Sequence, residues 1–281
     1  MIEYQPDKYW EDRLTKHFSL RGVGFLNLGL EYNKWLYKTR LRMLGKFIKK
    51  HHISTYGKRI LDIGVGTGFY IDFWERQGVR HIAGLDITQK SISELENKYP
   101  QHSFIRGDIA EELCFGQKFD IITCFDILFH IVENDKFDQA IRNIKSFSHR
   151  NTWILISDLF LNEYKPPAFH ENDRTLIKYK WVLEANDLQI VDIHPIFYLS
   201  STPVDANAIK SKSLQLILRV LWSIVYKVLY YSNHNKLKNA GGERIGFVLG
   251  WLLYHVDGII LRFVKTGPST KLLLAQAQKD Q

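Results

Sequence analysis

The most diagnostic segment of the chain is Ile60-Leu61-Asp62-Ile63-Gly64-Val65-Gly66-Thr67-Gly68. An apolar run contains an acid near its end, and three glycines follow at a spacing of two residues. The apolar run is typical of a strand buried in a parallel sheet. The glycines indicate a tight turn from strand to helix in which the backbone approaches a ligand closely. The sequence therefore predicts a ligand-binding turn at the end of an inner strand.

A second acid stands where such a turn needs one. The next apolar run, His81 to Leu85, ends in Asp86, eighteen residues after Gly68. A carboxylate in this place can accept hydrogen bonds from both ribose hydroxyls of a nucleoside. The ligand expected from these two features is a nucleoside.

This arrangement resembles the class I S-adenosylmethionine-dependent methyltransferases, in particular those that act on small molecules. Their fingerprint is an acid followed by G-x-G-x-G, and Asp62, Gly64, Gly66 and Gly68 match it position by position. In the dinucleotide fingerprint G-x-G-x-x-G the third glycine comes one residue later, where this chain has Phe69. A nicotinamide-dependent oxidoreductase is therefore the less favoured alternative.

The resemblance implies S-adenosylmethionine as cofactor and S-adenosylhomocysteine as product. Asp62 would accept from the amino group of the methionine part, and Asp86 would bind the ribose. Asp108 would receive the adenine amino group, Ile109 would pack on the ring, and Phe125 would lie beside the sulfonium. The cofactor-binding residues expected in this way are Asp62, Gly64, Gly66, Gly68, Asp86, Ile87, Asp108, Ile109 and Phe125.

Strand-like and helix-like segments alternate from residue 58 onward. Such alternation gives a doubly wound sheet that binds ligands at the carboxyl ends of its strands. We expect an α/β fold with a seven-stranded, mostly parallel, Rossmann-like sheet. By the resemblance, the last strand runs antiparallel between the fifth and sixth. Strands are predicted at 59–63, 81–85, 102–106, 119–125, 152–158, 188–198 and 271–277, and helices within 7–50 and at 68–77, 88–98, 109–113, 134–148 and 171–186.

Three parts are expected along the chain. Residues 1–55 form an N-terminal helical cap, and 56–204 with 266–281 form the cofactor-binding domain. Residues 205–265 are an insertion with two apolar helices, at 214–231 and 245–264, joined by the Asn/Gly-rich segment 233–242. Charges within both helices argue against membrane spans. The insertion is either a hairpin packed on the sheet domain, or a substrate lid or membrane-surface element.

His130 follows the fourth strand by a few residues, and we expect it to be the catalytic general base. Transfer to a hydroxyl requires loss of a proton, and imidazole titrates near neutral pH. The alternative is a histidine that only positions the following helix. Asp126, at the end of the same strand, either orients the imidazole or caps that helix.

Polar and aromatic residues near the expected cleft are candidates for binding the acceptor. Aromatic faces suit a sulfonium or an apolar acceptor, although aromatics at helical spacing usually form core. Asp126 and Asp158 could hold Mg²⁺ in a catechol-type enzyme, but Leu159 stands where those enzymes carry asparagine, so no metal is expected. The acceptor-binding candidates are Tyr32, Trp35, Arg40, His170, Arg174 and Tyr179.

Composition bounds the partners. The formal charge of +8 is compatible with solvated helix faces, an anionic substrate or peripheral membrane contact through 210–265. No Asn/Asp-Pro-Pro-aromatic motif follows the fourth strand, and no nucleic-acid partner is expected. Two cysteines and a polar N-terminus favour the cytoplasm.

The function expected from these features is O-methylation of a small molecule of secondary metabolism: a natural product, a glycan or a lipid-like intermediate. Two alternatives stay open. One is N-methylation of a small molecule. The other is a non-catalytic binding protein that keeps the cofactor fold and works at a membrane surface.

Overall fold

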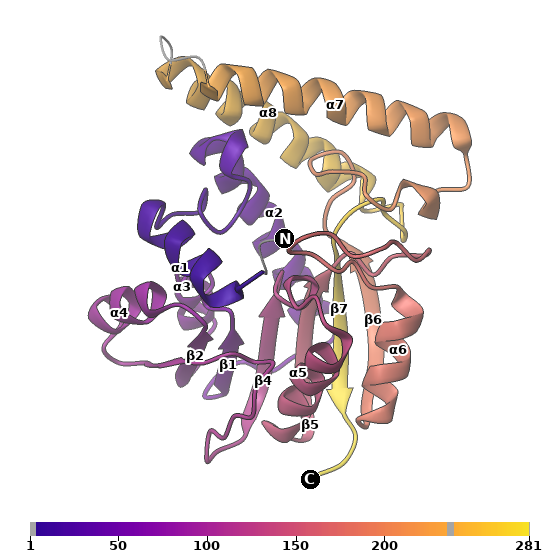
Figure 1. Cartoon of the computed structure of the whole chain (residues 1–281). Coiled ribbons are helices and arrows are strands. Elements are labelled where there is room, and N and C mark those ends of the chain that lie inside the picture. Colours follow the sequence, from indigo (N-terminus) through magenta and orange to yellow (C-terminus); the bar gives the residue numbers. More distant parts are fainter. Residues whose placement is uncertain (1–3, 235–238, 281) are drawn as a thin grey trace.

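The computed structural model describes residues 4–234 and 239–280. A seven-stranded sheet in the order β3-β2-β1-β4-β5-β7-β6 forms its centre (Figure 1). Neighbouring strands from β3 to β5 pair in parallel, whereas β7 is antiparallel to both β5 and β6, as the resemblance implied. The strands are β1 (Arg59–Ile63), β2 (His81–Asp86), β3 (Ser103–Arg106), β4 (Phe119–Phe125), β5 (Ser148–Asp158), β6 (Leu188–Pro195) and β7 (Lys271–Ala277).

Helices cover both faces of the sheet, and each face has its own core. Ile60 of β1 belongs to the core that includes α2, α3 and α4, while the next residue, Leu61, belongs to the core under α5 and α6. Successive residues of a strand point to opposite faces, which explains this division. The helices are α1 (Pro6–Lys16), α2 (Leu30–Lys50), α3 (Ile71–Arg76), α4 (Gln89–Lys98), α5 (Asn134–Ser146), α6 (Leu176–Ala185), α7 (Lys212–His234) and α8 (Asn239–Ile260), with 3₁₀ turns η1 (Leu26–Leu28), η2 (Leu128–His130) and η3 (Ala206–Ala208).

The prediction of a short helix at 109–113 is wrong, because this segment is a loop. The Asp108 carboxylate accepts from the amide of Ala110, and the Asn143 side chain donates to the carbonyls of Ile109 and Glu111. Side chains thus satisfy backbone groups that a helix would otherwise pair. The other predicted elements are present, with boundaries that differ by a few residues, most clearly at α6 and α8.

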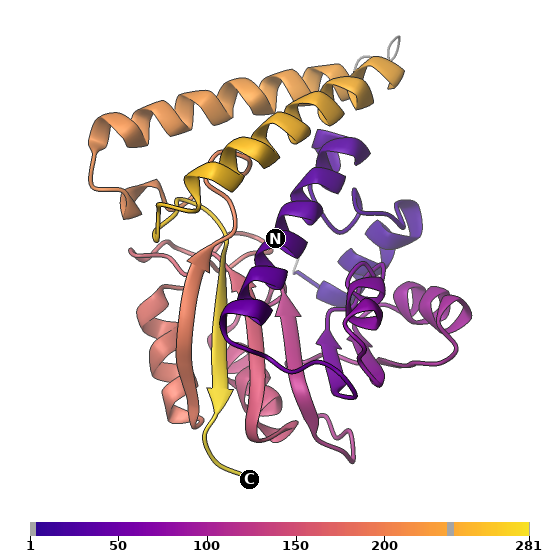
Figure 2. The same cartoon turned by 180° about the vertical axis from the view of Figure 1, so that it is seen from behind.

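The insertion forms a pair of helices that lies across one end of the molecule, beyond the carboxyl edge of the sheet (Figures 1 and 2). Helix α8 packs on α2 at close range, since a Cβ at Gly250 would lie 2.6 Å from the Trp35 ring. Residues 1–3 of the predicted cap, 235–238 of the Asn/Gly-rich connection and the last residue of the predicted cofactor-binding domain lie outside the described residues.

By length and composition alone, α7 could cross a membrane, which differs from the prediction that neither insertion helix would qualify. Arg219 and Lys227 are its only charged residues between Leu214 and Tyr231, too few to exclude it on those criteria. Only 17% of its most apolar window is buried, so α7 is not an ordinary core helix.

Candidate functional site

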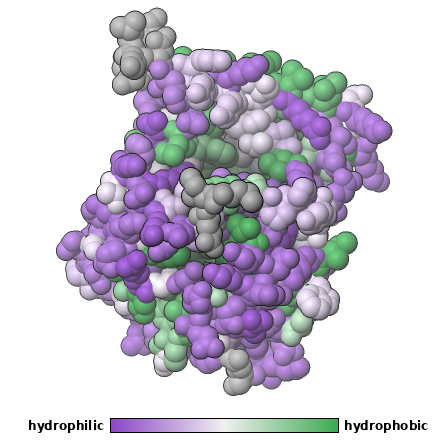
Figure 3. All heavy atoms as spheres, in the orientation of Figure 1, coloured by the Kyte–Doolittle hydropathy of each residue, from purple (hydrophilic) through white to green (hydrophobic). Residues whose placement is uncertain are grey.

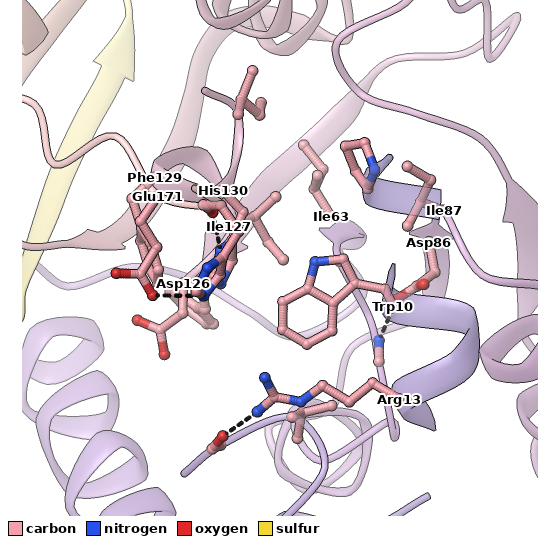
Figure 4. A pocket seen from close by; sticks show the side chains of 18 of the residues that line it. Trp10, Arg13, Ile63, Asp86, Ile87, Asp126, Ile127, Phe129, His130 and Glu171 are labelled. Atoms are coloured by element: carbon pink, nitrogen blue, oxygen red, sulfur yellow. Dashed lines mark hydrogen bonds and ion pairs between the residues drawn. The ribbon is translucent and has the colours of Figure 1, made fainter. Parts of the chain in front are cut away.

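A cavity of about 1150 Å³ opens at the carboxyl ends of β1, β2 and β4. The turn after β1 forms part of its wall, and α1 with the segment that follows it covers one side. Figure 4 shows Asp86 and Ile87 on one side, His130 and Asp126 on the other, and the Trp10 indole between them. A pocket of this size exceeds what one nucleoside fills, so there is room for two ligands.

The glycine turn has the conformation that the sequence predicted. Gly64, Gly66 and Gly68 have φ angles of +73°, +53° and +73°, where residues with a side chain are strained. Gly64 and Gly66 line the cavity. Gly68 lies outside its lining and packs behind the turn, where a Cβ would lie 2.6 Å from the Leu95 side chain. Gly68 therefore shapes the turn instead of contacting a ligand.

Asp86 is held in place at the end of β2. Its carboxylate accepts from the Gly66 amide at 2.8 Å and from the amide and hydroxyl of Thr88 at 2.9 and 2.7 Å. These bonds tie the end of β2 to the glycine turn. A carboxylate has about four acceptor positions, so capacity remains for a ligand in the cavity. The predicted residues Ile87, Asp108 and Ile109 also line the cavity.

Asp62 lies beneath the cavity wall and outside its lining. It is buried, and its carboxylate accepts from the Thr123 hydroxyl at 2.6 Å. Burial raises the pKa of Asp62 to about 7, an effect that the Thr123 hydrogen bond opposes. Near neutral pH, a cation bound beside Asp62 would therefore shift its carboxyl toward the ionised form.

Aromatic rings surround the end of β4. Phe125 packs against Tyr70, with ring centroids 4.7 Å apart, and Tyr37 packs against Phe69 at 4.8 Å. All four rings line the cavity. Tyr37, Phe69 and Tyr70 were not among the predicted site residues. The position of Phe69 and Tyr70 directly after the glycine turn is a signal that could have identified them.

His130 lies in η2 with its two ring nitrogens in different environments. Its Nδ1 lies 3.1 Å from the His170 carbonyl, and a carbonyl can only accept, so Nδ1 carries the proton and Nε2 keeps its lone pair. The ring lies edge-on to Trp10 at 4.9 Å and parallel to the His170 ring at 5.8 Å. Burial lowers the pKa of His130 to about 4. The imidazole is therefore neutral at physiological pH.

Asp126 has neither of the two roles considered for it. Its carboxylate accepts from Nε of Arg40 at 2.9 Å and from the Ser157 hydroxyl at 2.8 Å, and the N-cap of α5 is Glu133. Asp126 has a positive φ of 58°, and its amide donates to the Ser157 carbonyl. Arg40 lines the cavity as predicted, but its guanidinium is engaged by Asp126. The pair fastens α2 to the end of β4.

Four predicted acceptor-binding residues lie outside the cavity lining and make other contacts. The Tyr32 hydroxyl donates to the Ser200 carbonyl, and Trp35 packs against α8. Tyr179 is buried and donates to Asp158, and Arg174 is buried against the turn that carries His130. The remaining two candidates do line the cavity, namely Arg40 and His170.

Arg174→Met is expected to lower the free energy of unfolding by about 3 kcal/mol. The guanidinium donates to the carbonyls of Leu128 at 3.2 Å and Ile131 at 2.8 Å, in and just after η2. Its removal leaves these acceptors without that donor. Urea unfolding of the apo protein measures the change, with Lys180→Met on the exposed side of α6 as matched control. Equal stability of the two variants would contradict the structural role of Arg174.

Three potential metal-ligating atoms come together at the cavity wall. Among residues 4–234 and 239–280, His130, His170 and Glu171 each offer one donor atom, and these atoms lie within 4.8 Å of one another. His170 and Glu171 already interact with each other at 3.2 Å. Asp126 and Asp158, the pair considered for Mg²⁺, bond to Arg40 and Tyr179.

Residues 60–150 match the family model of a methyltransferase domain. Among curated relatives, the ubiquinone biosynthesis O-methyltransferase of Actinobacillus pleuropneumoniae is 26% identical over 95 residues, which are 30% of this chain and 40% of that one. The same enzyme of Idiomarina loihiensis is 25% identical over 209 residues, 63% of this chain and 82% of that one. Alignments with the first relatives thus span about 40% of their length.

A solved structure with the same fold is that of a putative sarcosine dimethylglycine methyltransferase from Galdieria sulphuraria. It has a TM-score of 0.61 and 14% sequence identity, and the match covers 95% of this chain and 98% of that chain. The solved structure thus shares the fold of this chain, and residues 60–150 match a methyltransferase domain.

Proposed function

We propose that this protein is an S-adenosylmethionine-dependent O-methyltransferase whose acceptor is a hydroxyl group on a small, largely apolar molecule. The observation that carries the proposal is the continuity of the cavity described above. It joins the glycine turn and Asp86 on one side to His130 on the other. Its volume accommodates a nucleoside cofactor and a second molecule together. Apolar residues beyond the cofactor side, among them Phe129 and Ile131, favour an apolar acceptor.

The residues present fit the cofactor. Gly64 and Gly66 bring backbone close to the ligand, and a Cβ at Gly64 would lie 2.1 Å from the Ile127 side chain, so a larger residue would displace Ile127 as well as strain the turn. Asp86 keeps about one acceptor position for the ribose, and Asp108 offers one for the adenine amino group. The rings around the end of β4 offer faces that attract a sulfonium.

The bound cofactor supplies a methyl group that already carries a good leaving group. Held by the glycine turn and Asp86, the cofactor would supply this methyl group to the acceptor oxygen, and the electron pair of the broken carbon–sulfur bond would stay on sulfur. The hydroxyl becomes strongly acidic as the new bond forms, so a weak base is sufficient. Nε2 of His130 takes the proton, and the His170 carbonyl at Nδ1 stabilises the resulting charge. Holding the acceptor and the cofactor in line with each other supplies much of the remaining rate acceleration.

The proposal is tested by incubating the full chain with labelled S-adenosylmethionine and hydroxylated acceptors of increasing apolar size. Mass spectrometry then locates the added methyl group. Methyl transfer to oxygen supports the proposal, and transfer to nitrogen selects the N-methyltransferase alternative. Binding of S-adenosylhomocysteine without turnover on any acceptor would leave only the binding-protein alternative.

The same assay in a metal chelator tests whether a bound cation takes part. We expect unchanged turnover, because proton transfer to His130 needs no metal. A loss of turnover that is restored by a divalent cation would contradict the base mechanism and point to His130, His170 and Glu171.

Cofactor affinity is expected to rise with pH up to about pH 7 and then level off. Asp62 has its pKa raised to about 7 by burial, so below that pH its carboxyl is neutral. The cofactor's ammonium group favours the ionised carboxylate, and binding at low pH must therefore release a proton. Calorimetric titration with S-adenosylhomocysteine in buffers of different ionisation enthalpy measures both effects. In Asp62→Asn this pH dependence should disappear; its persistence would refute the assignment to Asp62.

A further inference from the structure

Helix α7 has one face that packs on the protein and an apolar face that does not. Leu218, Trp222 and Leu229 are buried, and Trp222 approaches Phe25 near η1, with ring centroids 6.5 Å apart. On the exposed side the apolar residues recur at helical spacing, which places them in one stripe. This stripe consists of Ile217, Leu221, Ile224, Val228 and Tyr231, whose exposed fractions range from 43% to 68%.

Helix α8 has the same division. Gly246, Gly250 and Gly258 face α2, and a Cβ at Gly246 would lie 3.3 Å from the Tyr32 amide nitrogen. The side away from the glycines exposes a second apolar stripe that continues into the turn after the helix. It consists of Ile245, Val248, Leu252, Ile259 and Phe263. We call the two stripes together the α7–α8 face. Figure 3 shows apolar side chains at the upper edge of the molecule, where these helices lie.

The charges around the α7–α8 face have one sign. Residues 210–265 contain nine lysines and arginines and two acids. Both acids accept hydrogen bonds from other parts of the protein. Glu243 accepts from the backbone amides of Leu30 and Glu31. Asp257 accepts from the backbone amides of residues 198–200 and from the Ser200 hydroxyl. Seven lysines and arginines of this segment lie in the part of the chain that the structure describes, and all seven are exposed. None of them forms an ion pair with another described residue. They are Lys210, Lys212, Arg219, Lys227, Arg244, Arg262 and Lys265.

We propose that the α7–α8 face docks the protein on a membrane surface that carries anionic lipid headgroups. Exposed apolar stripes enter the boundary between headgroups and acyl chains, and the flanking cations pair with the headgroups. A second copy of the chain would instead place like charges opposite one another. Because Leu218, Trp222 and Leu229 pack on the protein, α7 lies in the membrane plane and does not cross the bilayer.

This docking also places the cavity beside the membrane. Phe25 and Leu26 lie where α7 packs on the protein, and both line the cavity. Ser201 and Thr202 also line the cavity, and they directly follow the segment that binds Asp257 of α8. An apolar acceptor dissolved in the bilayer could therefore reach the cavity along the edge of the α7–α8 face. The docking itself does not depend on the proposed methyl transfer.

Vesicle flotation of the full chain, without cofactor or acceptor, tests the docking. We expect binding to vesicles of phosphatidylcholine mixed with phosphatidylglycerol, and much weaker binding to phosphatidylcholine alone. Ile217→Glu combined with Ile224→Glu should lower the partition coefficient by more than about tenfold. The matched control is Ile177→Glu, at an apolar residue of α6 that is 74% exposed, and it should bind like the wild type.

The electrostatic part is tested separately. Arg219→Gln combined with Lys227→Gln should weaken binding to the anionic vesicles by about fivefold per charge and leave the weak binding to phosphatidylcholine unchanged. Lys180→Gln, at an exposed lysine on α6, serves as control. Circular dichroism confirms that each variant is folded.

Two results would overturn the proposal. One is a lack of binding by the wild type to the anionic vesicles. The other is a dimer in solution that Ile217→Glu with Ile224→Glu dissociates, because a second copy would then cover the face. Since the assay contains no cofactor or acceptor, either result would leave the proposed methyl transfer intact.

Discussion

Asp86→Ala is expected to weaken the binding of S-adenosylhomocysteine by about 100-fold. The carboxylate lines the cavity at the end of β2 and, in the proposed complex, accepts a hydrogen bond from the ribose. Hydrogen bonds to a charged group contribute about 1.5–3 kcal/mol each, so loss of the acceptor has a large effect. The substitution also removes the acceptor of the Gly66 amide and loosens the glycine turn. Isothermal titration calorimetry measures the affinity.

Two further variants separate binding from folding. Asp86→Asn keeps the size of the side chain and part of its acceptor capacity, and should lose less affinity than the alanine variant. Asp158→Asn changes another buried acid, at the end of β5, that lies outside the cavity lining. It should leave the affinity unchanged. If Asp158→Asn weakened binding as much as Asp86→Ala, the effect would be structural, and the ribose assignment would be lost.

His130→Ala is expected to lower kcat by about a hundredfold or more, with little change in the affinity for S-adenosylhomocysteine. The variant removes the Nε2 that takes the acceptor's proton. His170→Ala is the matched variant, because it keeps the backbone carbonyl at 3.1 Å from Nδ1 but removes the adjacent ring. We expect it to raise the KM for the acceptor and to affect kcat less. Equal kcat values for wild type and His130→Ala would refute the assignment of the base.

The pH profile gives an independent check of the same residue. Burial lowers the pKa of His130 to about 4, so at saturating cofactor the kcat/KM for the acceptor should stay flat through neutral pH and fall only as the pH approaches 4. The free energy of unfolding should also depend on pH through His130. Between the unfolded pKa, about 6.5, and the folded value, the unfolded chain binds the proton and the folded one does not. The contribution of neutral His130 to stability is therefore lost as pH falls through this range, and His130→Ala should lose less stability there.

The fold could be predicted well because the elements that define it are encoded locally. The run from Ile60 to Gly68 specifies a buried strand and a left-handed turn with little dependence on the rest of the chain. The loop at 109–113 was mispredicted because Asn143, far along the chain, binds its carbonyls. Helix boundaries depend on such distant partners, which a single sequence does not reveal.

Most of the residues expected on the cofactor side line the cavity, since they follow strand ends. Which of the acceptor-binding candidates line it could not be predicted, because this depends on how separate elements pack. Tyr32 and Arg40 lie on the same helix, yet only Arg40 lines the cavity, since the Tyr32 hydroxyl bonds to Ser200. Arg174 was predicted as an acceptor contact from its place after the fifth strand. Arg174 instead donates to the carbonyls of Leu128 and Ile131, which are brought together only when the η2 turn has formed.

The position of β7 has a consequence for synthesis on the ribosome. This strand lies between β5 and β6, although β6 ends at Pro195 and β7 begins only at Lys271. While the chain grows, β5 and β6 leave the ribosome before their shared neighbour, so each exposes an unpaired edge. Residues 205–265 are translated during this interval, and their apolar helices emerge before the sheet is complete. Under the proposed docking, α7 and α8 could bind a bilayer during this interval. Their apolar side chains would then be protected from aggregation until the last strand inserts.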